Sequence, residues 1–593
     1  MKRLFFNVVF LFVILMSPAT ATDDTECAIL SLTQDAGEPD WHTVTFTGNS
    51  HTNYTVHWKD TIDKDSPWND LHYFAIQEDL FFNANGTVKW IDRGIDPRMN
   101  GKTPGDVPQR FYKVSAKLPS AKYIILVIGD GMHLQHEIAA SRYRYGTDYG
   151  MIWHSFPHSA YVTTWDVDTY NRYAMRAEVA EYDEQTFISS IGYDVTSGGI
   201  APYPVDRSGS ESYFLTKIKG YGTNTYYPAT DSASSATAMS TGRKTNEGNI
   251  SWIYNDPDNG AIETIAVQMR SQKGASIGIV STMPFSHATP AAFVSNNKSR
   301  ENYYTGYKDY EGLGIADQII TEVKPDIVIS GGHPILNNPT WDTTKGFLSQ
   351  SLYTTLSASE EYIFAERQSG VDGATTIQVA AQNAVAQNKK LFGLFGGVKG
   401  YFEPQLARDI PGAPSVVRST IENPTLADSA LAALTVAATD NDGFFLMIEQ
   451  GDIDTANHYN NFQWMIASMW DLEEAVKTIV AYVDRPDDDI DWSNTLLIVT
   501  SDHANSYMRL SENPLLQKGD LPLQQGSSDS YVYPDGEVSY RIGDHTNELV
   551  CLYAMGDAGK LLNEHKGTLY PDTQIIDNTH IYRILRKAAR IDD

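Results

Sequence analysis

Short apolar runs alternate with longer amphipathic stretches along most of the chain after Lys122. The runs are candidate strands, and they span residues 123–128, 277–280, 326–329, 391–395, 444–448, 495–499 and 549–554. Between them, apolar residues recur with helical spacing in residues 261–272, 375–388, 425–439 and 463–483. Because strands that alternate with helices build parallel sheets, this pattern predicts an α/β domain whose central, largely parallel sheet carries helices on both faces.

Residues 22–118 follow a different pattern. Alternation of apolar and polar residues at 42–46, 54–58, 87–90 and 110–114, with an Asn85-Gly86 turn before the third run, is typical of short antiparallel strands. We therefore expect a small all-β module there, followed by the α/β domain over residues 119–593.

The regular pattern is interrupted between about residues 165 and 227, in a stretch rich in Tyr, Asp, Ser and Gly. An irregular span of this length inside a compact domain is often a functional insertion or lid. A surface excursion far from any chemistry explains the composition equally well, so both interpretations stay open.

The first 21 residues have the pattern of a secretory signal peptide. Lys2 and Arg3 precede an apolar run over residues 4–16, and Ala19-Thr-Ala21 supplies a small-residue cleavage site. No later stretch approaches the ~20 apolar residues of a membrane-spanning helix. These features predict export to the periplasm or the extracellular space, with no membrane span.

Acidic residues outnumber basic ones, and the formal charge of −29 becomes −31 when Lys2 and Arg3 leave with the signal peptide. A chain this negative is not expected to bind nucleic acid or anionic membranes. An anionic substrate would need local positive charge, for which bound metal ions are an obvious source. The two cysteines, Cys27 and Cys551, do not make a disulfide framework, and neither is expected to be a nucleophile.

Ser232 follows Asp231 at the start of a run of small residues that ends at Gly242. A serine that opens a helix faces free backbone N–H groups and the positive end of the helix dipole, which favours phosphate. A close-packed structural helix would have the same composition, so this segment alone does not identify a nucleophile.

Three of the apolar runs end in side chains that bind metal ions. These are Asp130, Glu449 and the pair Asp502-His503. The carboxyl ends of strands form the ligand crevice of open α/β sheets, so these side chains should converge. Asp454 and His458 follow Glu449 at a spacing that suits one helical face. A single acidic residue at a strand end often only caps a helix, but three such ends with histidines favour zinc, or magnesium where oxygen ligands dominate.

On these motifs the chain resembles the alkaline phosphatases from about Lys122 to its end. The motifs are Ile128-Gly-Asp-Gly-Met132, Thr230-Asp-Ser-Ala233, His287-Ala-Thr-Pro-Ala-Ala292, Arg300, Glu449 with Asp454 and His458, Asp502-His-Ala504, and His545. The resemblance implies a metal-dependent hydrolase that cleaves phosphate monoesters through a phosphoserine and releases inorganic phosphate. It also implies a homodimer.

The resemblance further implies a role for each motif residue. One zinc ion would be held by Asp454, His458 and His545, and a second by Asp130, Asp502 and His503, with Ser232 facing both. A third ion would take Asp130, Thr289 and Glu449, with His287 contacting it through water. Arg300 would bind two phosphate oxygens as a fork while Asp231 holds its guanidinium.

Two positions depart from the commonest family pattern. His287 stands where some relatives carry Asp, which makes zinc as well as magnesium acceptable at the third site. Thr455 stands where Lys, His or Trp is often found, which predicts weaker retention of phosphate. His133, His136 and His333 match no family ligand and are expected to be structural or to lie on the surface.

Two alternatives remain. A phosphodiesterase or sulfatase of the same superfamily is disfavoured because Ser232 lacks the C/S-x-P-x-R setting of sulfatases, and because an arginine fork requires two unesterified phosphate oxygens. The second alternative is a surface-binding protein that acts mainly through its N-terminal module and has a secondary phosphatase activity.

Overall fold

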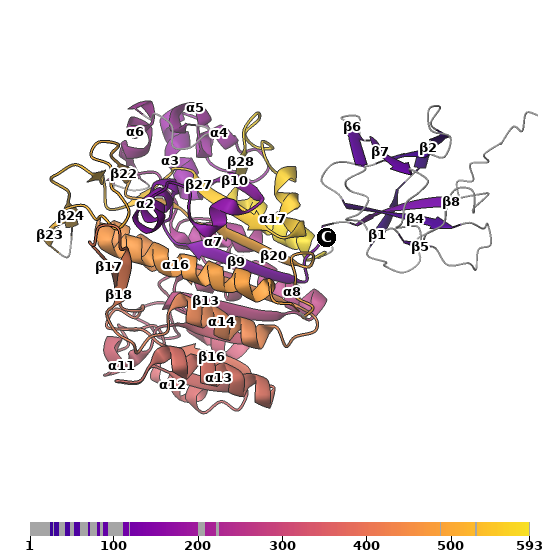
Figure 1. Cartoon of the computed structure of the whole chain (residues 1–593). Coiled ribbons are helices and arrows are strands. Elements are labelled where there is room, and N and C mark those ends of the chain that lie inside the picture. Colours follow the sequence, from indigo (N-terminus) through magenta and orange to yellow (C-terminus); the bar gives the residue numbers. More distant parts are fainter. Residues whose placement is uncertain are drawn as a thin grey trace, which may run out of the picture. The chain divides into compact units, whose positions relative to one another are not determined.

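The computed structural model describes residues 24–27, 29–34, 42–47, 53–59, 69–70, 80–83, 87–92, 111–117, 119–199, 208–220, 225–486, 488–527 and 530–591. The chain divides into two compact units, Met1–Pro119 and Ser120–Asp593 (Figure 1). Residues 1–21, on which the signal-peptide prediction rests, lie outside the described residues, as does the expected Asn85-Gly86 turn.

The described part of the first unit consists of two four-stranded antiparallel sheets, with strand orders β1-β8-β4-β5 and β2-β3-β7-β6. The strands are β1 Asp24–Cys27, β2 Ile29–Gln34, β3 His42–Thr47, β4 Asn53–Lys59, β5 Asn69–Asp70, β6 Leu80–Asn83, β7 Thr87–Asp92 and β8 Phe111–Lys117. Val44 pairs with Trp90 and Phe46 with Val88 across β3 and β7, and all four side chains are buried. The four expected strands are all present.

The described residues of the second unit contain a ten-stranded sheet of order β15-β16-β14-β13-β19-β9-β20-β27-β10-β28. Its strands are β9 Tyr123–Gly129, β10 His158–Thr163, β13 Ser276–Pro284, β14 Ile327–Gly331, β15 Tyr362–Glu366, β16 Lys390–Leu394, β19 Phe444–Gln450, β20 Thr495–Thr500, β27 Val550–Met555 and β28 Ile575–Asp577. All are parallel except β27, which runs antiparallel to both of its neighbours. The seven predicted strands all belong to this sheet, and the predicted α/β class is confirmed.

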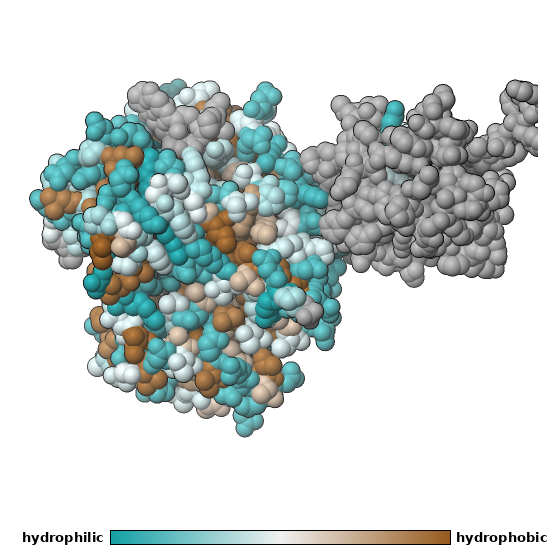
Figure 2. All heavy atoms as spheres, in the orientation of Figure 1, coloured by the Kyte–Doolittle hydropathy of each residue, from teal (hydrophilic) through white to brown (hydrophobic). Residues whose placement is uncertain are grey.

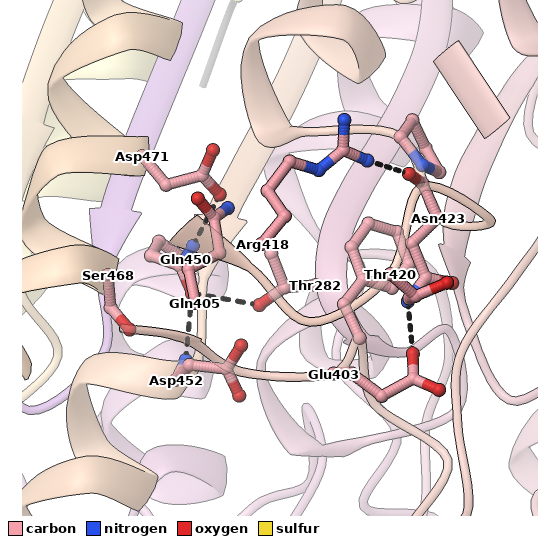
Figure 3. Close-up of a pocket in the computed structure, with 12 residues that line it drawn as sticks. Thr282, Glu403, Gln405, Arg418, Thr420, Asn423, Gln450, Asp452, Ser468 and Asp471 are labelled. Atoms are coloured by element: carbon pink, nitrogen blue, oxygen red, sulfur yellow. Dashed lines mark hydrogen bonds between the residues drawn. The ribbon is translucent and has the colours of Figure 1, made fainter. Parts of the chain in front are cut away.

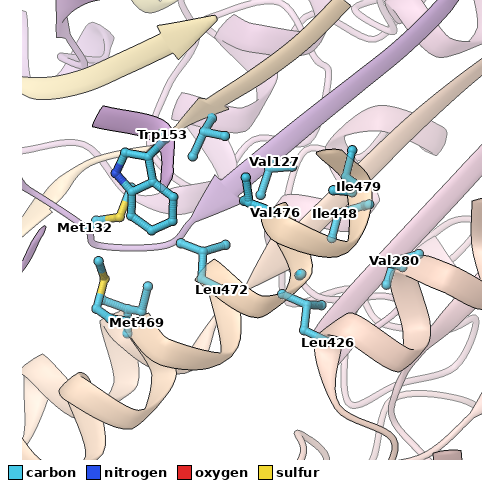
Figure 4. Close-up of a cluster of buried hydrophobic side chains, with 14 of the residues drawn as sticks. Val127, Met132, Trp153, Val280, Leu426, Ile448, Met469, Leu472, Val476 and Ile479 are labelled. Atoms are coloured by element: carbon cyan, nitrogen blue, oxygen red, sulfur yellow. The ribbon is translucent and has the colours of Figure 1, made fainter. Parts of the chain in front are cut away.

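Helices cover both faces of the sheet. Successive residues of its central strands point to opposite sides, and because these residues are apolar, both faces must be buried. Ile125 and Val127 of β9 belong to one buried cluster, whereas Leu126 and Ile128 belong to the other. The helices over the first face are α13 Gly373–Gln387, α14 Leu426–Ala437 and α16 Phe462–Val483, and those over the second are α7 Ser232–Thr241, α8 Ile265–Lys273, α9 Ala288–Val294 and α17 Asn578–Ala588. Figure 4 shows side chains of α16 lying against Val127 and Ile448.

The stretch expected to be irregular contains helices that the sequence pattern did not predict. They are α3 Val167–Ala177, α4 Ser189–Gly192, α5 Val195–Gly198 and α6 Ser208–Leu215, followed by β11 Ile218–Lys219 and β12 Thr225–Tyr226. Its aromatic residues join the buried cluster on the first face of the sheet, and the Trp165 and Tyr170 rings lie 5.6 Å apart and the Tyr182 and Phe187 rings 5.5 Å apart. The buried apolar residues of α3, Val167, Tyr170, Tyr173 and Ala174, recur at helical spacing, so the sequence carries a helical period that the Tyr-, Asp- and Ser-rich composition obscured.

The remaining elements connect these layers. They are α2 Leu134–Tyr145, η2 Ile152–Ser155, α10 Ile315–Asp317, η3 Gln318–Val323, α11 Pro334–Asn337, α12 Gln350–Ser357, β17 Gln405–Arg408, β18 Ser415–Arg418, α15 Asp452–His458, β21 Ala504–Asn505, β22 Arg509–Leu510, β23 Gln525–Ser527, β24 Ser530–Val532, β25 Val538–Ser539, β26 His545–Thr546 and η4 Asp557–Glu564. None of the helices in the described residues is long and apolar enough to cross a membrane. On the face shown in Figure 2, hydrophobic residues are interspersed among hydrophilic ones.

Candidate active site

Three neighbouring central strands, β19, β9 and β20, place the predicted ligands at the carboxyl-terminal end of the sheet. Ile128 of β9 is in register with Glu449 of β19 and with Thr500 of β20, so the residues that follow leave the sheet together. Gly131 has φ +71°, and a Cβ at this position would lie 2.9 Å from the Asp454 Cα. Only glycine allows the end of β9 to approach α15 this closely.

Asp454, His458 and His545 form the first group of candidate ligands. His458 Nε2 lies 3.1 Å from Asp454 Oδ2, and His545 Nε2 lies 3.4 Å from Asp454 Oδ1. The other ring nitrogens face backbone carbonyls, with His458 Nδ1 2.9 Å from Gly543 O and His545 Nδ1 2.8 Å from Thr230 O. Such carbonyl partners fix the tautomer, so that both Nε2 atoms turn their lone pairs toward a common point.

Asp130, Asp502 and His503 form the second group. His503 Nε2 lies 3.4 Å from Asp130 Oδ1 and 3.2 Å from Asp502 Oδ2. Within each group the candidate ligand atoms all lie within 4.8 Å of one another. The rings of His503 and His545 stack at 3.6 Å, so the two groups are adjacent. Burial raises the pKa of Asp130, and Asp502, Asp454 and Glu449 add to this effect by repulsion.

Glu449 and Thr289 are two of the residues predicted to hold a third ion, and the structure places Glu449 beside both Thr289 and Asp130. Glu449 Oε2 accepts a hydrogen bond from Ser281 Oγ on the neighbouring strand. Burial raises the pKa of Glu449 to about 7, although contacts with Ser281, Thr289 and Asp130 favour its charged form. Among the described residues, the buried Thr289 Oγ1 and Glu449 Oε1 have no hydrogen-bond partner, and Asp130 Oδ1 and Asp502 Oδ2 have no partner beyond their contacts with His503. Unpaired carboxylate oxygens are costly to bury unless they coordinate metal ions.

Ser232 opens α7 beside the second group. Its Oγ lies 3.1 Å from His503 Nε2, and the side chain is buried. Asp231 caps the helix by accepting a hydrogen bond from Ser234 N at 2.9 Å, and the helix ends at Gly242, whose φ is +72°. The expected helix terminus at Ser232 is therefore present.

Arg300 is held in place by Asp231. Arg300 Nη1 donates to Asp231 Oδ2 at 2.8 Å, and the Arg300 backbone N donates to Gly248 O at 2.7 Å. Burial opposes ionisation of Asp231, but Arg300 and the Ser234 donors outweigh it and lower its pKa. His287 Nε2 lies 3.4 Å from Arg300 Nη2, and burial together with Arg300 lowers the pKa of His287 to about 3. His287 thus stands beside the arginine as a neutral ring, a contact that the sequence did not predict.

The structure also brings in residues that the sequence reasoning missed. Asn505 Nδ2 donates to Asp454 Oδ1 at 2.5 Å, and Ser281 donates to Glu449. Asn505 follows Asp502-His-Ala504 directly, and Ser281 follows the apolar run of residues 277–280, which are the signals that could have indicated them.

The histidines and cysteine set aside in the sequence lie outside the two groups. His133 and His136 are buried at the start of α2, and His333 Nε2 lies 2.8 Å from Glu366 Oε2. Cys551 is a buried thiol in β27. The Cys27 side chain is outside the described residues.

A polar cavity lies next to the ligand cluster, at the end of β19 (Figure 3). Gln450, the residue after Glu449, links the cavity walls, since its Nε2 donates to Asp471 Oδ2 at 2.8 Å and its Oε1 accepts from Thr282 Oγ1 at 3.0 Å. Asp452 is 4 % exposed, and its Oδ1 has no hydrogen-bond partner among the described residues. Burial raises the pKa of Asp452, followed by repulsion from Asp471, Glu449 and Glu403.

Asp452→Asn is expected to stabilise the protein at alkaline pH. An unfolded aspartate loses its proton above pH ~4, whereas the folded state retains it, so stability falls by up to about 1.4 kcal/mol per pH unit until the raised pKa is passed. Asparagine has no such pH dependence. The difference in melting temperature between variant and wild type should therefore grow as the pH is raised from 5 toward 9, up to the pH at which Asp452 ionises in the folded protein.

Thermal unfolding across this pH range, with the exposed Asp489→Asn as the matched control, measures the effect. A difference that does not change with pH would contradict the assignment of a buried, uncompensated carboxyl to Asp452.

Comparisons with known proteins converge on one family. A family model described as alkaline phosphatase matches residues 202–554. Over 291 residues the chain is 28% identical to alkaline phosphatase 4 of Bacillus subtilis, covering 48% of this chain and 52% of that protein. Over 295 residues it is 28% identical to alkaline phosphatase of Escherichia coli, covering 47% and 58%. The chain thus spans about half the length of these curated relatives.

Among solved structures, the alkaline phosphatase of the Antarctic bacterium TAB5 is 19% identical, with a TM-score of 0.48, and covers 80% of this chain and 100% of that one. The Thermus thermophilus alkaline phosphatase is 18% identical, with a TM-score of 0.49, and covers 80% and 93%.

Proposed function

This chain belongs to the alkaline phosphatase family, whose model matches more than half of it, and we propose that it hydrolyses phosphate monoesters through a phosphoserine on Ser232, releasing inorganic phosphate. The observation that carries the proposal is the position of Ser232 Oγ, 3.1 Å from His503 Nε2 and beside two groups of candidate metal ligands. Because His503 would use Nε2 to hold a metal ion, it would not serve as a general base, and Ser232 would need the metal centre to become a nucleophile.

The donor set suits two zinc ions and a third ion. The first group offers two imidazoles and a carboxylate, and the second offers one imidazole and two carboxylates, which are typical zinc ligands. Glu449, Thr289 and Asp130 offer oxygen, which suits magnesium, while the nearby His287 makes zinc acceptable there. When bound, these ions supply the positive charge that activates the Ser232 hydroxyl and stabilises the departing ester oxygen.

The protein's own residues then bind and orient the phosphate. Ser232 Oγ forms a bond to phosphorus as the bond to the ester oxygen breaks, and the alcohol leaves with a proton. Water then attacks the phosphoserine, the bond between phosphorus and Ser232 Oγ breaks, and inorganic phosphate leaves. Arg300, fixed through Nη1 by Asp231, presents its remaining N–H groups to two phosphate oxygens, and the N-terminus of α7 adds backbone donors.

The arginine fork favours monoesters over diesters. Two terminal oxygens must be unesterified to accept its N–H groups, and a diester has one negative charge fewer to neutralise. We expect an aryl phosphate to be hydrolysed at least about 100-fold faster, in kcat/KM, than a bis-aryl phosphate or an aryl sulfate, from ~3 kcal/mol of lost charge-assisted bonding.

Steady-state rates on these three esters test the proposal, and Arg300→Ala is expected to narrow the preference for the monoester. Comparable rates on the monoester and the diester would contradict the proposed monoesterase and favour a phosphodiesterase. Turnover of the sulfate ester alone would indicate a sulfatase.

Two further parts of the proposal rest on the sequence. The N-terminal pattern supports an exported enzyme of the periplasm or the extracellular space. The family resemblance supports a homodimer.

A further inference from the structure

Asp166, just before α3, connects the stretch of residues 165–227 to the nucleophile helix. Its Oδ1 caps α3 by accepting from Thr169 N at 2.6 Å, and its Oδ2 lies 3.1 Å from Ser234 Oγ on α7. Asp166 is 1 % exposed, and so is Ser234. The two side chains are 68 positions apart in sequence, so this contact exists only because α3 begins against the first turn of α7.

Ser234 stands between two carboxyl groups with a single proton to donate. Its Oγ lies 2.7 Å from Asp231 Oδ1, 3.1 Å from Asp166 Oδ2 and 2.8 Å from Thr230 Oγ1. A hydroxyl donates one hydrogen bond and accepts up to two. If the Ser234 hydroxyl donates its proton to Asp231, a hydrogen bond between Asp166 and Ser234 requires a protonated Asp166 that donates to Ser234 Oγ.

The hydrogen bonds donated to its Oδ1 orient the Asp231 carboxylate. Three donors converge on that oxygen: Ser234 N at 2.9 Å, Ser234 Oγ at 2.7 Å and Gly248 N at 3.1 Å. Asp231 Oδ2 is thereby left for Arg300 Nη1 at 2.8 Å. Losing the Ser234 hydroxyl would leave only the two backbone donors on Oδ1, so the carboxylate and the guanidinium bound to it would be held less firmly.

We infer that Asp166 is a positioning residue for phosphate binding, which acts by holding the Ser234 hydroxyl toward Asp231 so that Asp231 aims Arg300 at the substrate. This inference rests on the proposed function, because it concerns the affinity for a phosphate group. It assigns part of the stretch of residues 165–227 to the active site, in place of a surface excursion.

The surroundings of Asp166 favour the protonated acid that this chain of hydrogen bonds requires. Burial raises the pKa of Asp166 to about 8, and the nearby carboxylates of Asp168 and Glu247 add to the effect, while Arg172 opposes it. A protonated carboxyl can donate from Oδ2 to Ser234 while Oδ1 accepts from Thr169 N. An asparagine could make the same two bonds with its amide N–H and its carbonyl oxygen.

The first turn of α3 also forms hydrogen bonds with the loop of residues 245–248, which contacts both Asp231 and Arg300. Val167 N donates to Thr245 O at 3.0 Å, and Asp168 Oδ2 accepts from Glu247 N at 2.7 Å. The loop continues to Gly248, whose N–H binds Asp231 and whose carbonyl accepts from the Arg300 backbone. The helix therefore supports both partners of the Asp231–Arg300 pair.

The test measures binding and turnover separately in the full-length, metal-loaded protein. Asp166→Ala should raise the KM for an aryl phosphate and the inhibition constant of inorganic phosphate by about tenfold each, while kcat changes by less than about threefold. Asp166→Asn should restore most of the affinity. Ser234→Ala should reproduce the Asp166→Ala effect, and the double variant should be no worse than Ser234→Ala, because both act through one path.

Asp194→Ala is the matched control, since Asp194 caps α5 in the same stretch by accepting from Thr196 N at 2.9 Å and contacts neither Asp231 nor Arg300 in the described structure. It should leave both constants unchanged. A folded Asp166→Ala or Ser234→Ala protein with wild-type KM and inhibition constant would overturn the inference. An Asp166→Asn protein that binds phosphate as weakly as Asp166→Ala would also overturn it. If wild type itself neither hydrolysed aryl phosphate nor bound inorganic phosphate, the proposed function would fail, and the inference with it.

Discussion

Replacing Ser232 by alanine is expected to lower kcat for a phosphate monoester by at least about 1000-fold and to abolish the phosphoenzyme. The change removes the oxygen that would bond to phosphorus, an atom that lies 3.1 Å from His503 Nε2. It leaves the two candidate ligand groups intact, so bound metal should remain near the wild-type content. Acid-quenched mass spectrometry for phosphoserine, steady-state kinetics and elemental analysis measure the three quantities.

Ser240→Ala provides the matched control for this experiment. Ser240 is buried in the last turn of the same helix, and its Oγ donates to Thr237 O at 3.2 Å, away from the ligand groups. The control loses the same atom from the same helix and should retain most of the turnover. A phosphoserine that persists in the Ser232→Ala protein would show that another residue is the nucleophile.

The centre of the sheet was predictable from sequence, and its edges were not. Strands such as β9 and β19 are buried along their whole length, so they stand out as continuous apolar runs. By contrast, β15 lies at one edge and is only partly buried, β28 at the other edge has three residues, and β10 beside it begins with two residues that are not buried. Short or partly exposed strands carry too few apolar residues to be distinguished from loops.

The candidate ligands were predictable for a similar reason, and their supporting contacts were not. Asp130 and Glu449 directly end or follow buried strands, so position along the chain indicates their position in space. The contact between Ser234 and Asp166 spans 68 residues and depends on where α3 begins. The contact between His287 and Arg300 depends on the conformation of the chain between them. No local pattern encodes either of these contacts.

Removing bound metal is expected to abolish turnover and to lower thermal stability together. The buried carboxylates of Asp130, Glu449 and Asp502 lie near the half-buried Asp454, and burial and mutual repulsion raise the pKa of Asp130 and of Glu449. An ion present at 100 times its dissociation constant stabilises the folded state by about 2.7 kcal/mol, so the loss of two or three ions should lower the melting temperature by roughly 5–15 °C. Thermal unfolding and activity before and after chelation, followed by addition of zinc and magnesium, measure the effect.

Two aspartates of the same short helix make the experiment specific. Asp454 belongs to the first ligand group, whereas Asp452, two residues earlier, belongs to neither group and lines the cavity at the end of β19. Asp454→Asn removes one charged ligand, so this variant should bind less metal and its melting temperature should fall less on chelation. Asp452→Asn should show the full wild-type decrease on chelation. Equal decreases in both variants would mean that chelation acts on the fold elsewhere, and activity that survives in a metal-free sample would exclude metal activation of Ser232.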